Sequence, residues 1–302
     1  MIIATRQYGQ LGNRLRLYAH VMAAAIEYDV TLYFPYLGEY AVYCPTVRND
    51  RWCRYPTKVG HNCFDSKEIQ PFTRSEQFSR WLLCKQVYLF ARTLSHLRCT
   101  CFPAHVIRLK DGRYCDLHTS EIRKKAQSTR PLLVAGFGFS SDELLNKHAQ
   151  RIREHFQIHP VHQKNVDLTM KPLRQSGTKI IGVHIRHGDY RTWQGGRYYY
   201  PVEEYAASMK ELADRNHNSG TRFLVCGNAK VSALDFPGLD VSFSTGHLIE
   251  DLYSLPKTDL IIGPPSTFSG WAAFMGDVAL LRMLRVENRE GLIDPELLNA
   301  SL

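Results

Sequence analysis

The sequence predicts an α/β fold with parallel β-sheets, divided between two domains. Short apolar runs alternate with helical stretches along the 302 residues, which is typical of chains that build parallel sheets. The chain is 44% hydrophobic, enough for two sizeable cores at this length. A polar stretch at 160–176 predicts the domain junction, which gives one domain of residues 1–170 and a second of residues 171–302.

The predicted elements follow the chain in order. Residues 1–5 predict a strand, a glycine turn follows at 9–14, and residues 15–27 predict a helix. Apolar residues at helical spacing predict an amphipathic helix at 78–97, and residues 142–156 predict another helix. Further short apolar runs predict buried strands at 132–136, 180–183, 222–226 and 259–263.

A polar cluster directly after the strand at 180–183 is the first candidate site. It contains His184, Arg186, His187 and Asp189. In open α/β sheets, ligands bind just beyond the carboxyl ends of the strands. The planar guanidinium of Arg186 can hold a diphosphate with two hydrogen bonds and stabilise the charge of a departing phosphate. The alternative is that His184 and Asp189 cap the strand and Arg186 pairs with a surface carboxylate.

Two more strand–turn–helix junctions support a ligand site. Near the start, Gly9, Gly12 and Asn13 lie between the first strand and its helix, where backbone N–H groups can face an anion or a polar ligand. Near the end, the strand at 259–263 leads through two prolines into a second turn and a helix start. That turn contains Ser266, Thr267, Phe268 and Ser269.

Together these junctions resemble a known family. The segment His184-Ile-Arg-His-Gly-Asp-Tyr190 resembles the HxRxGDY motif of fucosyltransferases, and Gly9-Gln-Leu-Gly-Asn13 resembles their amino-terminal GxxGN turn. Ser266-Thr-Phe-Ser269 with Trp271-Ala-Ala273 resembles the STFSWWAA segment of α-1,2-fucosyltransferases. The three motifs occur in the family's order and span the chain from residue 9 to residue 273.

The resemblance implies a metal-independent, inverting glycosyltransferase of GT-B type, with two Rossmann-like domains facing across a cleft. Residues 1–170 would be the acceptor-side domain and residues 171–302 the donor domain. The enzyme would transfer L-fucose from GDP-β-L-fucose to a hydroxyl of an oligosaccharide or glycoconjugate, in α-1,2 linkage. No cofactor is implied, because GDP-fucose is a substrate.

The resemblance also implies roles for individual residues. Arg186 would hold the β-phosphate, His184 would shape the donor pocket, and Asp189 would orient Arg186 or contact the sugar. The turn of Ser266, Thr267, Phe268 and Ser269 would line the diphosphate and sugar pocket. Gly9, Gly12 and Asn13 would close the site from the other domain.

Departures from the family pattern leave the donor, linkage and acceptor open. Many α-1,2 enzymes have a second arginine where this chain has His187, and Gly270 replaces one tryptophan of their WW pair. Arg14 and Arg16 also differ from the usual sequence after the glycine turn. A GT-B enzyme that uses another nucleotide sugar is therefore an alternative. Asp189 and His187 are both candidates for the general base.

Other enzyme classes lack their motifs in this sequence. No Asp-x-Asp pair is present to hold a divalent metal, and neither a P-loop nor a complete dinucleotide fingerprint occurs. Neither HExxH nor GxSxG occurs. Kinase, dehydrogenase and hydrolase activities therefore have no motif in their favour, and no metal is expected.

The positive charge lies in the amino-terminal half. Residues 1–170 contain 24 Lys and Arg against 14 Asp and Glu, whereas residues 171–302 contain 14 against 15, for a net charge of +9. The basic half could bind nucleic acid, anionic lipid or an acidic acceptor, or be only a solvated surface. No nucleic-acid-reading motif is present, so nucleic acid is not an expected partner. The helix at 78–97 could lie on an anionic membrane, or it could pack on the core.

The start of the sequence leads us to expect a cytoplasmic protein. Residues 1–5 look like a strand of the fold and lack the features of a signal peptide. In a reducing compartment the eight cysteines would be thiols, and a Cys-x-Cys spacing is not a usual zinc arrangement. The membrane-lying helix would place the protein at the inner face of the membrane.

Overall fold

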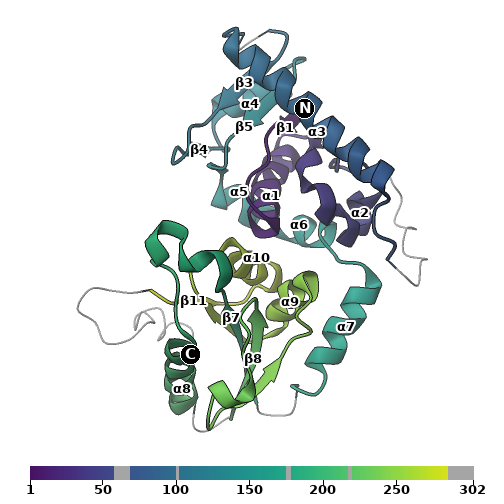
Figure 1. Ribbon diagram of the computed structural model, residues 1–302. Helices are drawn as coiled ribbons and strands as arrows, with labels where there is room; N and C mark the ends of the chain where they lie inside the picture. Colours follow the sequence, from purple (N-terminus) through teal and green to yellow (C-terminus); the bar gives the residue numbers. More distant parts are fainter. Residues whose placement is uncertain (58–68, 100–101, 175–177, 217–219, 285–302) are drawn as a thin grey trace. The chain divides into compact units, whose positions relative to one another are not determined.

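The computed structural model describes residues 1–57, 69–99, 102–174, 178–216 and 220–284. The chain divides into two compact units, Met1–Val161 (unit 1) and His162–Leu302 (unit 2), each made of one uninterrupted stretch. Figure 1 shows the elements of each unit. The boundary between the units, after Val161, lies within the polar stretch at 160–176 but earlier than the expected boundary at residue 170. Helix α7 (Pro160–Met170) occupies the first part of this stretch.

Unit 1 contains a four-stranded parallel sheet in the order β2-β1-β5-β3 and a parallel pair β4-β6. The strand bounds are β1 Ile2–Ala4, β2 Leu32–Tyr33, β3 His105–Arg108, β4 Cys115–Asp116, β5 Leu132–Ala135 and β6 Phe139–Ser140. β1 and β5 are central, which agrees with their apolar sequences. The strands at 1–5 and 132–136 that the sequence predicts are confirmed.

Helix α1 (Leu11–Glu27) is the buried helix of unit 1. It begins four residues before the expected start at residue 15, so Gly12 and Asn13 belong to its first turn. A run of small alanines lets the surrounding elements approach it closely, and Ala23, Ala24 and Ala25 are at most 1% exposed. The other helices are η1 Pro35–Tyr43, α2 Pro45–Arg48, α3 Arg74–His96, α4 Ser120–Gln127, α5 Asp142–Lys147 and α6 Ala149–His155.

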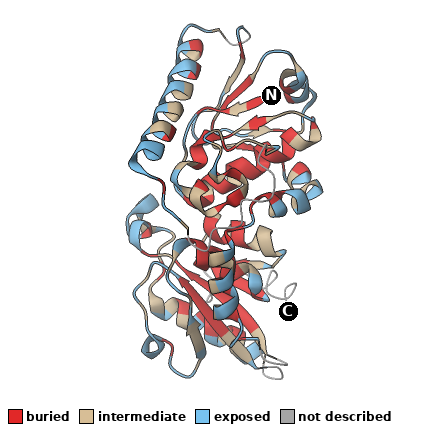
Figure 2. Ribbon diagram, turned by 90° about the vertical axis from the view of Figure 1, so that its right-hand side faces the viewer, coloured by how far each residue is buried: buried red, intermediate tan, exposed pale blue. Residues whose placement is uncertain are grey.

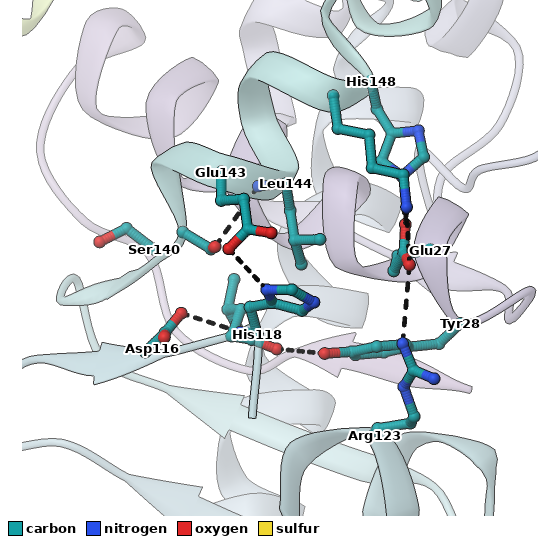
Figure 3. A network of polar contacts seen from close by, with 12 residues as sticks. Glu27, Tyr28, Asp116, His118, Arg123, Ser140, Glu143, Leu144 and His148 are labelled. Atoms are coloured by element: carbon teal, nitrogen blue, oxygen red, sulfur yellow. Dashed lines mark hydrogen bonds and ion pairs between the residues drawn. The ribbon is translucent and has the colours of Figure 1, made fainter. Parts of the chain in front are cut away.

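The carboxyl end of α1 is tied to its neighbours by charge (Figure 3). Glu27 pairs with Lys147 at 2.8 Å, with Nε2 of His148 at 2.9 Å and with Arg123 at 3.6 Å. These hydrogen bonds lower the pKa of Glu27. Beside this group, Nδ1 of His118 lies 2.9 Å from the Glu143 carboxylate. The network joins α1, α4 and α5 at the surface of unit 1.

Unit 2 contains a five-stranded parallel sheet in the order β11-β10-β7-β8-β9. The strand bounds are β7 Lys179–Ile185, β8 Thr221–Gly227, β9 Asp240–Phe243, β10 Leu260–Gly263 and β11 Leu280–Arg282. β7 is central and almost wholly buried, and its core partners include Phe223, Leu260 and Met209. Figure 2 shows buried residues running along the strands of both units. The strands predicted at 180–183, 222–226 and 259–263 are confirmed.

The helices of unit 2 follow its strands in the chain. Their bounds are α8 Val202–Arg215, α9 Leu248–Ser254 and α10 Thr267–Gly276, with short 3-10 segments η2 Gly188–Arg191, η3 Trp193–Gly196, η4 Ala233–Asp235 and η5 Leu255–Lys257. Strands alternating with helices on a parallel sheet confirm the predicted α/β class. None of the described helices is long and apolar enough to cross a lipid bilayer. Six cysteines are free thiols, whereas Cys63 and Cys101 lie outside the described residues.

Candidate functional site

The carboxyl ends of three neighbouring strands of unit 2 form the candidate site. β8, β7 and β10 are adjacent and parallel, so the residues that follow them share one edge of the sheet. Arg186 follows β7, Asn228 follows β8, and Ser266 lies three residues after the end of β10. The structure thus brings together two of the motifs that the sequence singles out, at 184–190 and at 266–269.

Arg186 is held by two neighbours at this edge. Its Nη2 donates to Oδ1 and Oδ2 of Asp189 at 3.1 and 3.0 Å, and its guanidinium lies 4.7 Å from the ring centre of Tyr190. Its Nε is buried and has no hydrogen-bond partner in the described part of the chain. A buried donor without a partner costs roughly 1–3 kcal/mol, so an anion bound at Nε would offset that cost.

His184 is a buried, neutral residue whose ring packs against another aromatic ring. Its ring stacks on Phe268 with centroids 4.8 Å apart, and burial lowers its pKa to about 3. The neutral imidazole can approach Arg186 without repulsion. Its Nδ1 is buried and has no partner among the described residues, so this atom also has unused hydrogen-bonding capacity.

Gly263 allows the two strands to meet closely beside His184. A Cβ atom at this position would lie 2.9 Å from the carbonyl oxygen of His184 and 3.1 Å from its Cβ. Both distances are tighter than ordinary packing contacts, so a larger residue would push β10 away from β7. The glycine therefore sets the spacing between the two motifs.

The turn after β10 ends in a capped helix. The Ser266 side chain accepts a hydrogen bond from the Phe268 backbone N–H at 3.2 Å and forms the N-cap of α10. Ser269 is fully buried, and its hydroxyl donates to the Ser266 carbonyl at 3.2 Å. The Tyr190 hydroxyl donates to the Pro265 carbonyl at 2.8 Å, which links the two motifs directly.

His187 faces the interior of unit 2. Its Nε2 lies 2.9 Å from the Tyr200 carbonyl, which can only accept, so this nitrogen carries the proton. Burial lowers its pKa, and its backbone N–H donates to Oδ1 of Asn228 at 2.8 Å. This arrangement suits a residue that fixes the loop, and the Nε2 atom is occupied. Asp189, with a side chain 54% exposed, is the more accessible of the two candidate bases.

The glycine turn of unit 1 is held by Arg14. Gly9 adopts a φ of +54°, which favours glycine. The Arg14 side chain is buried and donates from Nε to the Gly9 carbonyl at 3.3 Å and from Nη1 to the Tyr36 carbonyl at 3.2 Å. The same Nη1 pairs with Glu39 at 2.9 Å. Asn13 and Gly12 lie in the following helical turn.

Sequence reasoning missed three supporting residues. Arg14 was noted only as a departure from the family, although its side chain holds the turn. Asn228 and Asp251 were not singled out, yet Asn228 fixes the loop after β7. Asp251 accepts from the Ser244 hydroxyl at 2.7 Å and from the Gly227 backbone at 3.3 Å, and burial raises its pKa. The Gly-Asn pair that ends the strand at 222–226 was the available signal for Asn228.

One group among the described residues has the composition of a metal site. His162, His247 and Glu250 offer atoms that all lie within 4.8 Å of one another. However, Nδ1 of His162 lies at hydrogen-bond distance, 2.7 Å, from Oε1 of Glu250, which also accepts from Asn165 at 2.7 Å. The two imidazole rings stack, with centroids 4.6 Å apart and an interplanar angle of 25°. The group is better described as a hydrogen-bonded network.

Comparisons with known proteins agree on the fold. No protein-family model matches the sequence, and no curated protein matches it. The fucosyltransferase NodZ from Bradyrhizobium matches with a TM-score of 0.54 and 16% identity over 97% of both chains. An Arabidopsis thaliana FUT1 mutant in complex with GDP matches with a TM-score of 0.51 and 13% identity over 95% of this chain and 71% of its own.

A third match is POFUT1 in complex with GDP-fucose, with a TM-score of 0.51 and 10% identity over 94% of this chain and 98% of its own. At these identities the similarity concerns the fold. It extends over nearly the whole of this chain, as the ordered motifs do. The protein therefore has the GT-B α/β fold of fucosyltransferases, built on parallel sheets.

Proposed function

We propose that this protein is a fucosyltransferase that transfers L-fucose from GDP-β-L-fucose to a hydroxyl of a glycan, without a metal ion and with inversion. The observation that carries the proposal is Arg186, whose buried Nε, at the carboxyl edge of the unit 2 sheet, has no hydrogen-bond partner among the residues that the structure describes. The solved NodZ and POFUT1 structures with GDP-fucose share the fold. The motif around Arg186 resembles that of fucosyltransferases.

The reaction needs stabilisation of the leaving group. The acceptor oxygen forms a bond to the anomeric carbon as the bond from that carbon to the β-phosphate oxygen breaks. The electron pair leaves with GDP. Arg186 would take up the developing charge, and the N-terminus of α10 beside Ser266 and Thr267 would add backbone N–H groups. These positive groups would act where other glycosyltransferases use a divalent metal.

The neighbouring side chains would shape the donor pocket. His184 and Phe268 would present a stacked aromatic pair, and Asp189 would orient Arg186 through the contacts at 3.0 and 3.1 Å. The Ser269 hydroxyl would hold the turn through its hydrogen bond to the Ser266 carbonyl. The acceptor proton would pass to a general base, for which Asp189 remains the accessible candidate and His187 the buried one.

Unit 1 would bind the acceptor, with Gly9, Gly12 and Asn13 completing the site. The acceptor is an oligosaccharide or glycoconjugate, and no nucleic acid takes part. The α-1,2 linkage rests on the resemblance of residues 266–273 to that subgroup. NodZ is described as an α-1,6-fucosyltransferase, so the fold is compatible with more than one linkage. NMR of the product would assign the linkage.

The donor is tested with a panel of GDP-fucose, GDP-mannose and UDP-sugars. We expect turnover with GDP-fucose and heat of binding with GDP. If only another nucleotide sugar is turned over, the proposed donor is wrong, but a GT-B glycosyltransferase activity remains. Neither turnover nor GDP binding would contradict the proposal.

The role of Arg186 is tested by replacing it. Arg186→Ala should lower kcat by at least about 100-fold, because a preorganised cationic donor is lost. Arg186→Lys should keep the charge but lose the planar guanidinium, so its kcat should lie between those of the native protein and of Arg186→Ala. Both should retain the circular dichroism spectrum of the native protein.

Arg222→Ala is the matched control for this experiment. Arg222 also pairs with an aspartate, Asp240, at 2.8 Å, but it lies at the amino end of β8. This variant should keep near-normal turnover. Near-normal turnover in Arg186→Ala would contradict the proposed role.

A further inference from the structure

Helix α3 has an outer face that the described part of unit 1 leaves uncovered. Of its 23 residues only Arg80, Ala91 and Leu94 are buried. Figure 1 shows α3 along the outside of unit 1, and in Figure 2 it is coloured mainly as exposed or intermediate. Five of its large apolar side chains are nevertheless exposed: Phe78 61%, Trp81 53%, Leu82 40%, Leu89 53% and Phe90 50%, with Leu97 63% directly after the helix.

Phe78, Trp81, Leu82 and Leu89 form one surface, which we call the outer face of α3. At 3.6 residues per turn, positions 78, 82 and 89 fall on one line along the helix, with position 81 beside them. The rings of Phe78 and Trp81 stack at 5.7 Å. The opposite side anchors the helix, where Arg80 donates to the carbonyls of Arg48 and Asp50 and lies over the Phe72 ring. The helix is thus fixed in place while its apolar outer face remains uncovered.

From position 77 to position 110, every acidic or basic residue of the chain other than histidine is basic. Residues 77–110 contain no Asp or Glu, but six Lys and Arg. At 3.6 residues per turn, Lys85 and Arg92 lie between Trp81 and the line of Phe78, Leu82 and Leu89, and the Lys85 ammonium is 5.7 Å from the Trp81 ring centre. Lysine and arginine beside an exposed apolar stripe match a surface that is apolar within and negatively charged at its boundary.

The flank of the outer face nearer Leu82 and Gln86 adds positive charge and a cavity. A cavity of about 550 Å³ lies between α3 and residues 49–54, and its lining includes Arg51, Arg54, Leu82 and Gln86. Arg54 is paired with Asp50, whereas the side chain of Arg51 is exposed. A phosphate group could approach this flank while apolar chains cover Leu82.

From this pattern we infer that the outer face of α3 binds the surface of an anionic lipid bilayer, with the helix lying in the interfacial plane. The helix is too polar to span a membrane, and its apolar face, aromatic pair and flanking cations suit shallow insertion between headgroups. Binding at this face does not depend on the proposed reaction, because it needs neither donor nor acceptor.

The test is co-sedimentation of the untagged full chain with extruded vesicles. We expect retention on vesicles of phosphatidylcholine and phosphatidylglycerol at 7:3, at least tenfold stronger than on phosphatidylcholine alone, and weaker at 0.5 M than at 0.1 M salt. The double variant Trp81→Glu and Leu89→Glu should lower the bound fraction at least tenfold. Brominated lipids should quench native tryptophan fluorescence more than that of Trp81→Phe.

The matched control places the same two substitutions in unit 2. Leu168 and Leu234 are also exposed apolar residues, by 58% and 91%, so Leu168→Glu with Leu234→Glu makes the same change of charge at exposed apolar positions. This control should bind vesicles within about twofold of the native protein. Equal binding by the α3 variant, or no dependence on phosphatidylglycerol, would overturn the inference. So would a dimer by light scattering that the α3 variant converts to monomer, because a second copy would then cover the face.

Discussion

Arg14 shows how a single buried cation can hold a turn whose neighbours are the proposed functional residues. Its guanidinium donates to backbone carbonyls of two separate segments of unit 1, at Gly9 and at Tyr36, and it lies 4.8 Å from the Tyr40 ring centre. Glu39 supplies the countercharge, but its side chain is 62% exposed. The carbonyl contacts are therefore worth more than the ion pair, because solvent screens the latter.

This difference gives a prediction at the residue scale. Arg14→Leu should lower the free energy of unfolding by about 2–4 kcal/mol, because it leaves buried carbonyls without their donor. Glu39→Gln should cost less than about 1 kcal/mol. Urea denaturation measures both. Equal losses in the two variants would mean that the ion pair, and not the carbonyl contacts, stabilises the turn.

At this scale, the sequence predicts residues that lie within short motifs and misses those that act across the fold. Arg186, Asp189 and Tyr190 are close in the chain, and their contacts follow from that closeness. The bond from His187 to Asn228 joins residues 41 positions apart, and the one from Arg14 to Tyr36 joins residues 22 apart. Such contacts depend on which strands are neighbours, and no short motif encodes strand order.

At the scale of an element, α10 combines two tasks at its N-cap residue. Ser266 caps the helix through the Phe268 backbone, and in the proposed reaction it also lies beside the diphosphate. The helix is apolar and its Trp271 is buried, so its start is fixed by packing as well as by the cap. Substitutions at Ser266 can separate capping from donor binding.

Two substitutions make this separation. Ser266→Ala should lower the free energy of unfolding by about 1 kcal/mol through loss of the cap. Ser266→Asp should keep the cap, because aspartate is an equally good N-cap, but its negative charge should weaken GDP binding by at least about tenfold. Calorimetry with GDP and thermal unfolding give the two readings. Unchanged GDP affinity in Ser266→Asp would place the diphosphate elsewhere.

Long, strongly patterned elements were predictable, whereas their ends were not. The Thr73 to Glu76 capping box starts α3 four residues before the expected residue 78. The helix expected at 142–156 breaks at His148, whose side chain bonds to Glu27 of α1. β7 continues through His184, because stacking on Phe268 makes a buried histidine acceptable. A local capping box set the start of α3, whereas contacts distant in sequence decided the other two boundaries.

At the scale of the whole molecule, three deeply buried histidines couple folding to pH. Burial lowers the pKa of His20 and His155 to about 4 and that of His184 to about 3. In the unfolded chain these groups bind protons below about pH 6.5. The folded state stays neutral there, so the unfolded state binds more protons and stability falls as the pH falls.

The expected slope is up to about 1.4 kcal/mol per pH unit for each histidine between pH 6.5 and about 4, and close to zero above pH 7. Replacing His155 with Gln should lower the pH slope of the unfolding free energy by the contribution of one histidine. His96→Gln, at an exposed position, should leave the slope unchanged. Urea denaturation at intervals from pH 7.5 to 4.5 is the measurement. Stability that stays level down to pH 5 would contradict this coupling.

Each unit is encoded by one unbroken stretch of the chain, and this has a consequence for synthesis. The described strands of unit 1, β1 to β6, are all translated before β7, the first described strand of unit 2. The amino-terminal half can therefore acquire its core during translation, with its partner half still unmade. Expressing the two halves as separate polypeptides becomes a practical way to study them.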